Sequence, residues 1–251
     1  MAGIVVVFDF DKTIIEVDSD NWVVDELGAT DLFNQLLPTM PWNSMMDRMM
    51  RELHAQGKTL EDIKEVLRRA PMHPRVVPAI KKAHALGCDL RIVSDANMFF
   101  IETILDHLDI KDCFTEINTN PSYVDDQGRL RISPIQASIA KEGKKRMIYL
   151  GDGSGDFCPS LKLKEGDFMM PRKNYPVWDL ICENRALLRA EIHEWADGAE
   201  LERVLLELIE KISIQESNNS NLAQLFSVDC KFESIPMAGH EALPPPLRVH
   251  Q

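Results

Sequence analysis

Three short polar strings hold the side chains of this sequence that are best suited to chemistry. They are DFDKT (residues 9–13), SDAN (residues 94–97) and GDGSGD (residues 151–156). Between them they offer carboxylates that can act as nucleophiles, transfer protons or bind a metal ion, and a hydroxyl that can donate a hydrogen bond. Any one of these aspartates could simply cap a helix or hold a turn. Their meaning therefore depends on whether the fold brings the three strings together.

Each string directly follows an apolar run that is typical of a buried parallel strand. The runs are IVVVF (residues 4–8), LRIV (residues 90–93) and MIYL (residues 147–150). The carboxyl ends of parallel strands meet at one edge of an open α/β sheet, where ligands bind. Carboxylates gathered there repel one another unless a cation separates them. A hard divalent ion with oxygen ligands, Mg²⁺, would meet that requirement.

The remaining pattern alternates strands and helices, which predicts an α/β fold with a doubly wound, Rossmann-like parallel sheet. Residues 21–70 differ, because they carry helical periodicity and no strand pattern. We predict an α/β core of residues 1–17 and 74–212, a small inserted helical cap of residues 18–73, and a flexible tail of residues 213–251. The last expected helix is GAELERVLLELIEKI, and its periodicity fades where the tail begins.

Composition limits the classes of partner. The 251 residues carry 28 Lys+Arg against 40 Asp+Glu, a formal charge of −12, and they form no basic stripe, so we expect no nucleic-acid partner. No apolar stretch approaches the length of a membrane span, which predicts no membrane partner. The five cysteines are scattered and form no CxxC pair, as in a chain of reduced thiols. We therefore expect a cytoplasmic location.

The three strings together resemble a known superfamily. DFDKT fits the DxDxT signature of the haloacid dehalogenase (HAD) superfamily of phosphatases, SDAN its second motif and GDGSGD its fourth. The longer strings FDFDKTI, IVSDANMFFIE and YLGDGSGDFCP resemble the phosphoethanolamine/phosphocholine phosphatase family, nearest to its plant inorganic pyrophosphatase and thiamine phosphate phosphatase-like members. The similarity covers roughly residues 3–190. It implies a HAD-type core whose cap lies between the first and second motifs.

The resemblance also implies a role for each motif residue. Asp9 would attack phosphorus and form an aspartyl-phosphate, and Asp11 would act as general acid and then as general base. Mg²⁺ would be held by the Asp9 carboxylate, the Asp11 backbone carbonyl and Asp152, with Asp156 supporting the metal site. Ser94 would donate a hydrogen bond to a phosphoryl oxygen.

A substrate class follows from the same resemblance. It implies Mg²⁺-dependent hydrolysis of inorganic pyrophosphate or of a small phosphomonoester such as phosphocholine, phosphoethanolamine or thiamine phosphate. Asp20 and Asp95 align with residues that face a cationic head group in the phosphocholine-type relatives, although the same acids could instead hold a second metal ion. A closing cap would exclude water and large substrates. Trp22, Trp42 and the methionines at 45, 46, 49 and 50 are expected to pack inside the cap rather than line the site.

One part of the family pattern is missing. The superfamily places a lysine, its third motif, before the strand that leads to GDG, and in these relatives it follows a cysteine-rich stretch. Here RISP runs directly into IQASIAKEGKK. Lys141 is the candidate substitute, and Lys12 is a weaker one because its side chain is expected to point away. We therefore expect reduced activity. The alternatives are a phosphotransferase or mutase with the same nucleophile, or a low-activity regulatory protein that binds metal and phosphate.

Overall fold

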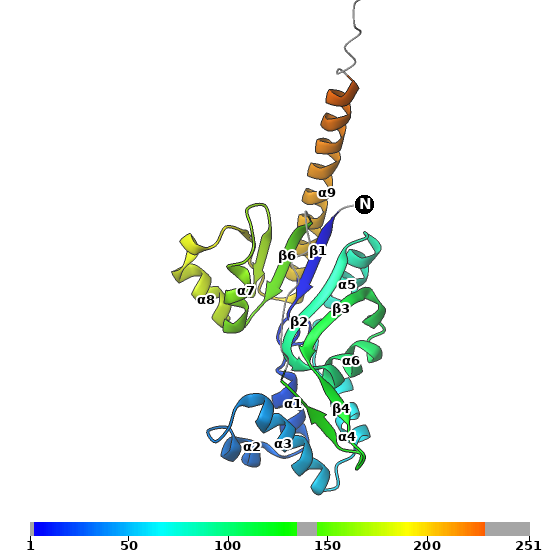
Figure 1. Cartoon of the computed structure of the whole chain (residues 1–251), viewed down its shortest axis with the longest axis vertical. Helices are drawn as coiled ribbons and strands as arrows, with labels where there is room; N and C mark the ends of the chain where they lie inside the picture. Colours follow the sequence, from blue (N-terminus) through cyan, green and yellow to red (C-terminus); the bar gives the residue numbers. More distant parts are fainter. Residues whose placement is uncertain (1–2, 135–144, 229–251) are drawn as a thin grey trace, which may run out of the picture. The chain divides into compact units, whose positions relative to one another are not determined.

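A six-stranded parallel sheet forms the centre of the computed structural model, which describes residues 3–134 and 145–228. The strand order is β3-β2-β1-β6-β7-β8, so the chain winds outward from β1 on one side and then returns to start again on the other (Figure 1). This order confirms the predicted doubly wound α/β fold, and its switch point lies between β1 and β6. The strands are β1 (Ile4–Phe8), β2 (Asp89–Asn97), β3 (Phe114–Asn120), β6 (Arg146–Gly151), β7 (Phe168–Pro171) and β8 (Glu191–Ile192).

Strand β1 is buried along its whole length because helices cover both faces of the sheet. Alternate residues enter two different hydrophobic clusters: Val6 packs in one, and Val5 and Val7 pack in the other. Helices of the first cluster are α5 (Val76–Ala85), α6 (Met98–His107) and α9 (Gly198–Val228). The second cluster includes α8 (Pro176–Glu183) and the residues beside α7 (Phe157–Ser160).

Several elements differ from the sequence-based expectation. Helix α9 continues to Val228, so the prediction that helical structure ends near Ile212 was wrong. Helix α8 and strand β8 were not predicted. The hairpin of β4 (Ser122–Val124) and β5 (Leu130–Ile132) was predicted and is confirmed. The chain divides into two compact units, Met1–Ser213 and Ile214–Gln251. The bounds proposed for the core, the cap and the tail stay predictions. Short 3-10 turns are η1 (Lys111–Cys113), η2 (Ser154–Asp156) and η3 (Arg185–Leu187).

The cap consists of four helices that follow β1: α1 (Ser19–Glu26), α2 (Thr30–Leu36), α3 (Trp42–Ala55) and α4 (Leu60–Arg68). A capping box of Thr59 and Asp62 begins α4. The methionines of α3 are fully buried, as expected, and belong to the same cluster as the core helices α5 and α6. Cap and core therefore share one continuous hydrophobic interior.

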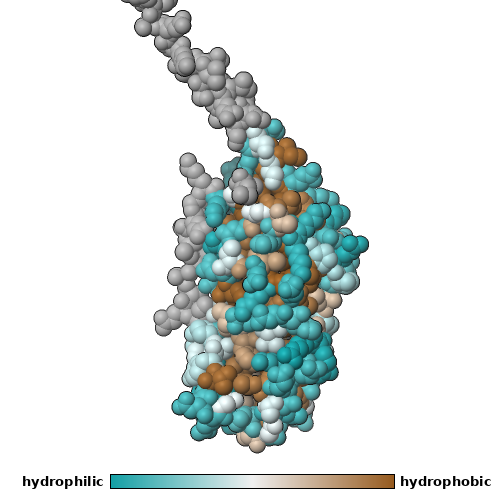
Figure 2. Space-filling view, turned by 90° about the vertical axis from the view of Figure 1, so that its right-hand side faces the viewer, coloured by the Kyte–Doolittle hydropathy of each residue, from teal (hydrophilic) through white to brown (hydrophobic). Residues whose placement is uncertain are grey.

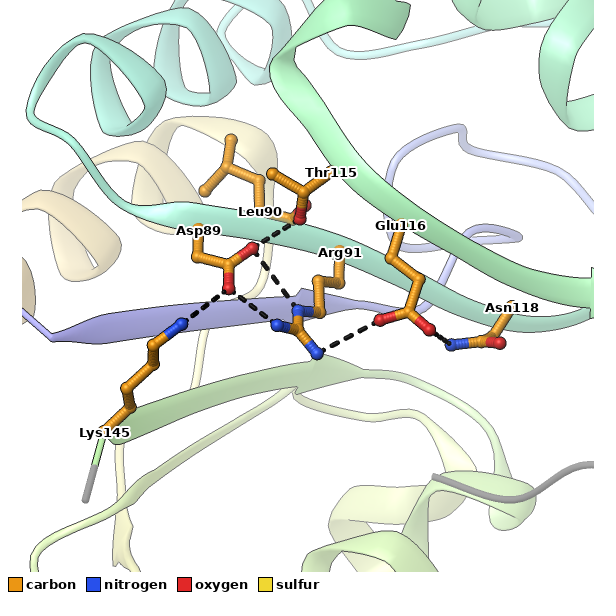
Figure 3. Close-up of polar contacts among 7 residues, drawn as sticks. All are labelled: Asp89, Leu90, Arg91, Thr115, Glu116, Asn118 and Lys145. Atoms are coloured by element: carbon orange, nitrogen blue, oxygen red, sulfur yellow. Dashed lines mark hydrogen bonds and ion pairs between the residues drawn. The ribbon is translucent and has the colours of Figure 1, made fainter. Parts of the chain in front are cut away.

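A polar network crosses strands β2 and β3 on the face that also carries Val7 (Figure 3). Asp89 accepts hydrogen bonds from Arg91 Nη2 at 2.7 Å and from Lys145 Nζ at 3.2 Å, and Arg91 Nη1 binds Glu116 Oε2 at 3.1 Å. The hydrogen bonds from Arg91 lower the pKa of Asp89 to about 2. Charged residues are tolerated within the sheet here because each is paired.

One face of the molecule is shown by its hydropathy in Figure 2. The face in Figure 2 is mostly hydrophilic, with hydrophobic residues in small separate groups. Among residues 3–134 and 145–228, no helix combines the length and the apolar character that a membrane span requires. A cytoplasmic location stays a prediction.

The hairpin β4–β5 is bound to the cap by one carboxylate. Asp47 on α3 accepts hydrogen bonds from Arg131 Nε at 2.8 Å, Arg131 Nη2 at 3.0 Å and the Ile132 backbone N–H at 3.1 Å. A bidentate arginine–carboxylate pair has a fixed geometry. It therefore holds α3, and the cavity-facing residues at the start of that helix, against the core.

Asp47→Ala should lower the free energy of unfolding by about 2 kcal/mol, because it leaves the Arg131 guanidinium and the Ile132 N–H without their acceptor. Urea denaturation measures this. Arg48→Ala, on the same helix, removes only an exposed pair with Glu52 at 3.5 Å and should change stability by less than about 0.5 kcal/mol. Equal effects of the two substitutions would contradict the assigned role of Asp47.

Candidate active site

The switch point of the sheet brings together carboxylates from two of the three strings. The Asp9 backbone N–H donates to Leu150 O at 2.9 Å, which extends the parallel ladder and places the end of β1 beside the end of β6. Asp9, Asp152 and Asp156 each present a carboxylate oxygen, and these oxygens all lie within 4.8 Å of one another. The fold thus brings together three acids of the first and third strings, while the roles expected of them stay predictions.

Asp156 is held in this cluster by the residues around it. Its carboxylate accepts hydrogen bonds from Tyr149 Oη at 2.6 Å and from the Gly153 backbone N–H at 2.9 Å. A Cβ atom on Gly151 would lie 2.3 Å from Asp156 Cγ, an impossible approach. The first glycine of GDGSGD is therefore required by contact with this acid, and Tyr149 is a supporting residue that the sequence did not reveal.

The pKa values of the cluster are raised. Burial is the main cause for Asp9, and the charges of Asp156, Asp11 and Asp152 raise its pKa further. Burial likewise raises the pKa of Asp156 to about 6. Only oxygen ligands are offered, and the charges are destabilised by one another, so the residues fit a hard divalent cation such as Mg²⁺.

Asp11 lies in the same cavity but has a different environment. Its Oδ2 accepts a hydrogen bond from Ser19 Oγ at 3.2 Å, whereas Oδ1 is buried with no partner among the described residues. Burial, followed by the charges of Asp18 and Asp20, raises the pKa of Asp11 well above its usual value. A carboxyl group in this state can hold a proton near neutral pH.

The SDAN string belongs to strand β2 itself rather than to the loop after it. Ser94 is buried and lines the cavity, and its Oγ accepts a hydrogen bond from the Ala96 backbone N–H at 3.3 Å. Asp95 is exposed at the cavity rim. Thr13 is buried and does not line the cavity.

A cavity of about 760 Å³ extends from the acid cluster to the cap. On its cap side, Asp20 accepts a hydrogen bond from Trp42 Nε1 at 2.7 Å, and the Asn97 side-chain amide lies near its other, buried oxygen. Burial raises the pKa of Asp20 to about 7. The expectation that Trp42 packs inside the cap was wrong, because its side chain lines the cavity and is 38% exposed. Its position at the start of α3 leaves it at the edge of the cap core.

An asparagine pair joins the cap to the sheet and was not found from the sequence. Asn43 Nδ2 donates to Asn120 Oδ1 at 3.0 Å, and Asn120 Nδ2 lies 3.2 Å from Asn43 Oδ1. Asn120 also donates to the Ala96 carbonyl at 2.8 Å and to the Asp95 carbonyl. The pair therefore links the start of α3 to the segment that carries Ser94.

The two lysine candidates have different outcomes. Lys12 lines the cavity, so the expectation that it points away was wrong. It has a left-handed backbone conformation (φ 53°), which changes the direction of its side chain and is not visible in the sequence. Lys141 lies outside the described residues.

A doubly wound sheet with an inserted helical cap and acids at the switch point is the architecture of solved HAD-fold proteins. A phosphoserine phosphatase, solved as an analogue of its phospho-aspartyl intermediate, aligns with a TM-score of 0.52 over 80% of this chain and 97% of its own. At 16% identity, this likeness shows the fold alone.

The family is shown by the sequence comparisons. The chain belongs to the family whose model is described as Putative Phosphatase, which matches residues 4–140 and 134–209. It is 59% identical to inorganic pyrophosphatase 2 of Arabidopsis thaliana over 274 residues, covering 98% of each chain. It is 49% identical to a thiamine phosphate phosphatase-like protein of Arabidopsis thaliana over 245 residues, covering 87% of this chain and 100% of that protein.

The raised pKa of Asp20 makes stability depend on pH. Between about pH 4 and 7 the folded protein keeps a proton that the unfolded chain has released, so the free energy of unfolding falls as pH rises through this window. Asp20→Asn removes this pH-dependent loss in the free energy of unfolding. In metal-free buffer it should stabilise the protein by about 2–4 kcal/mol at pH 8 and by much less at pH 5.

Denaturation in urea at the two pH values measures the difference. Asp31→Asn, on an exposed part of α2, is the matched control and should show no such pH-dependent gain. A gain at pH 8 no larger than the gain at pH 5 would contradict the cost assigned to the buried Asp20 carboxylate.

Proposed function

We propose that this phosphatase hydrolyses a small phosphorylated substrate through a phosphorylated Asp9, with Mg²⁺ as its cofactor. The observation that supports this most strongly is the convergence of Asp9, Asp152 and Asp156 oxygens within 4.8 Å at the switch point. These three carboxylates and the Asp11 carbonyl would hold the ion. When bound, Mg²⁺ would supply positive charge that keeps Asp9 ionised and offsets charge on the phosphoryl oxygens.

In the first displacement, an oxygen of Asp9 attacks phosphorus. A P–O bond to Asp9 forms while the P–O bond to the leaving group breaks, and Asp11 gives its proton to the leaving oxygen. The raised pKa of Asp11 suits this role. Ser94 donates to no acceptor among the described residues, so its hydroxyl proton is available to a phosphoryl oxygen.

In the second displacement, Asp11 is now a carboxylate and accepts a proton from water. The water oxygen forms a bond to phosphorus, and the bond to Asp9 breaks, which regenerates the Asp9 carboxylate and releases inorganic phosphate. The same residue can serve in both steps because it loses its proton in the first and recovers one in the second.

Inorganic pyrophosphate is the first candidate substrate, supported by the 59% identity to an inorganic pyrophosphatase over 98% of each chain. A small phosphomonoester with a cationic leaving group is the second. Its support is the buried Asp20 carboxylate in the cavity lining, whose negative charge a cation would offset. Asp95 at the rim would add to the same attraction.

Asp9→Asn should reduce phosphate release from pyrophosphate by at least about 10³-fold, because the nucleophile is lost. EDTA should abolish release in the unmodified protein, and Mg²⁺ should restore it. Asp112→Asn, an exposed carboxylate in η1, is the matched control. The measurement is phosphate release, together with acid-quench trapping of label from ³²P-pyrophosphate on the protein.

The alternatives give different results in the same experiment. A phosphotransferase or mutase would move label to a sugar acceptor faster than to water. A low-activity regulatory protein would bind Mg²⁺ and phosphate without turnover. Turnover that survives Asp9→Asn would contradict the covalent route.

Asp20→Asn should separate the two substrate candidates. If Asp20 faces a cationic leaving group, the ratio of kcat/KM for phosphocholine to that for pyrophosphate should fall by about tenfold or more, the loss expected for a charged hydrogen bond. Thiamine phosphate should behave like phosphocholine. A fall in the pyrophosphate value alone would instead indicate that Asp20 helps to hold a second metal ion.

A further inference from the structure

The charge balance of the cavity is unusual for a site that receives an anion. The described residues that line it include seven aspartates and a single basic side chain, Lys12. A phosphoryl group beside the acid cluster would face the carboxylates of Asp9 and Asp152. Besides a metal ion, Lys12 is the group in this lining that can offset that repulsion.

The Lys12 side chain is held in the cavity by its backbone. The left-handed conformation at Lys12 (φ 53°) is unfavourable for a residue with a Cβ atom, so it persists only where the surroundings impose it. Both backbone polar groups of Lys12 are bound: its N–H donates to Val17 O at 3.1 Å, and its carbonyl accepts a hydrogen bond from Arg172 Nη1. Its ammonium makes no hydrogen bond or ion pair with the described residues.

Arg172 is itself fixed on several sides, although it is buried to 5% exposure. Its guanidinium binds Glu16 and lies 4.5 Å from the Tyr175 ring centroid and 5.0 Å from the Trp195 ring centroid. Its backbone N–H donates to Gly151 O at 2.9 Å. Arg172 therefore ties the loop after β1 to the end of β6, which carries Asp152.

We propose that Lys12 is a catalytic residue that binds the transferring phosphoryl group, and that Arg172 is the positioning residue that directs it there. This inference rests on the proposed function. The Lys12 ammonium donates hydrogen bonds to a phosphoryl oxygen. Its positive charge stabilises the negative charge that develops on the phosphoryl group during transfer. No proton transfer is required of it.

The lining of the cavity agrees with this placement. Lys12 and Asp152 both line it, together with Asp9. An anion bound beside Asp152 would share the cavity with Lys12.

Lys12→Met and Lys12→Gly test the proposal together, because glycine adopts positive φ without strain and so keeps the backbone while removing the charge. Both should lower kcat by about 10²–10³-fold. Lys12→Arg should retain most of the rate, and Lys173→Ala, an exposed neighbour of Arg172 outside the cavity lining, should be unaffected. A loss in Lys12→Met without one in Lys12→Gly would overturn the charge-based role, as would a loss in Lys141→Ala with none at Lys12.

Binding provides a test that does not need turnover. In Asp9→Asn with Mg²⁺, calorimetry should show that adding Lys12→Met weakens the affinity for inorganic phosphate by about tenfold or more. Unchanged affinity would overturn the Lys12 proposal even if phosphatase activity is established. Weakened affinity in a protein without turnover would support it while the proposed function fails.

Arg172→Gln tests the positioning role. It should lower kcat by about tenfold or more by itself, but in the Lys12→Met background it should cost less than about twofold further, because it acts through Lys12. Thermal melting identifies variants that do not fold. Losses that multiply in the double variant would overturn the positioning role of Arg172.

Discussion

The repulsion among carboxylates that are gathered out of bulk water is the constraint on which this site depends. Asp9, Asp152 and Asp156 offer oxygens within 4.8 Å of one another, and burial alone already makes their ionised forms costly. The parallel sheet imposes this proximity, because Asp9 and Asp152 follow neighbouring strands at the switch point. The cluster is stable only with protons or a cation. The metal ion of the proposed function would relieve the same energetic cost.

The cap supplies further residues of the site. Hydrophobic packing, rather than the sequence motifs, fixes their positions. Buried methionines of α3 join the cluster that also contains the core helices, so the start of α3 has a fixed position over the cavity. From that position Trp42 reaches Asp20, and Asn43 reaches Asn120. A cap that shares the hydrophobic core cannot move freely. Opening the cap would have to break the Asn43–Asn120 pair, whereas the Trp42–Asp20 hydrogen bond lies within the cap.

Sequence reasoning succeeded where local chemistry follows directly from strand direction. A buried strand followed by DFD predicts both the parallel sheet and the place of Asp9, because side chains at a strand end have few alternatives. It failed for Lys12 and Trp42, whose directions depend on a positive φ and on an edge position in the cap. Asn120 and Arg172 gave no signal, since their partners lie far away in the sequence. Helix α9 continues to Val228, beyond the residues whose apolar periodicity predicted a helix.

The expected absence of a lysine-bearing stretch before β6 bears on the balance of charge in the site. An alignment of 274 positions with a chain of 251 residues leaves at least 23 gaps in this chain. The family model matches in two pieces that overlap at residues 134–140. A site that lacks one cationic side chain either binds phosphate more weakly or uses a different cation. Since Lys12 projects from the nucleophile's own loop, its charge does not depend on the length of the segment before β6.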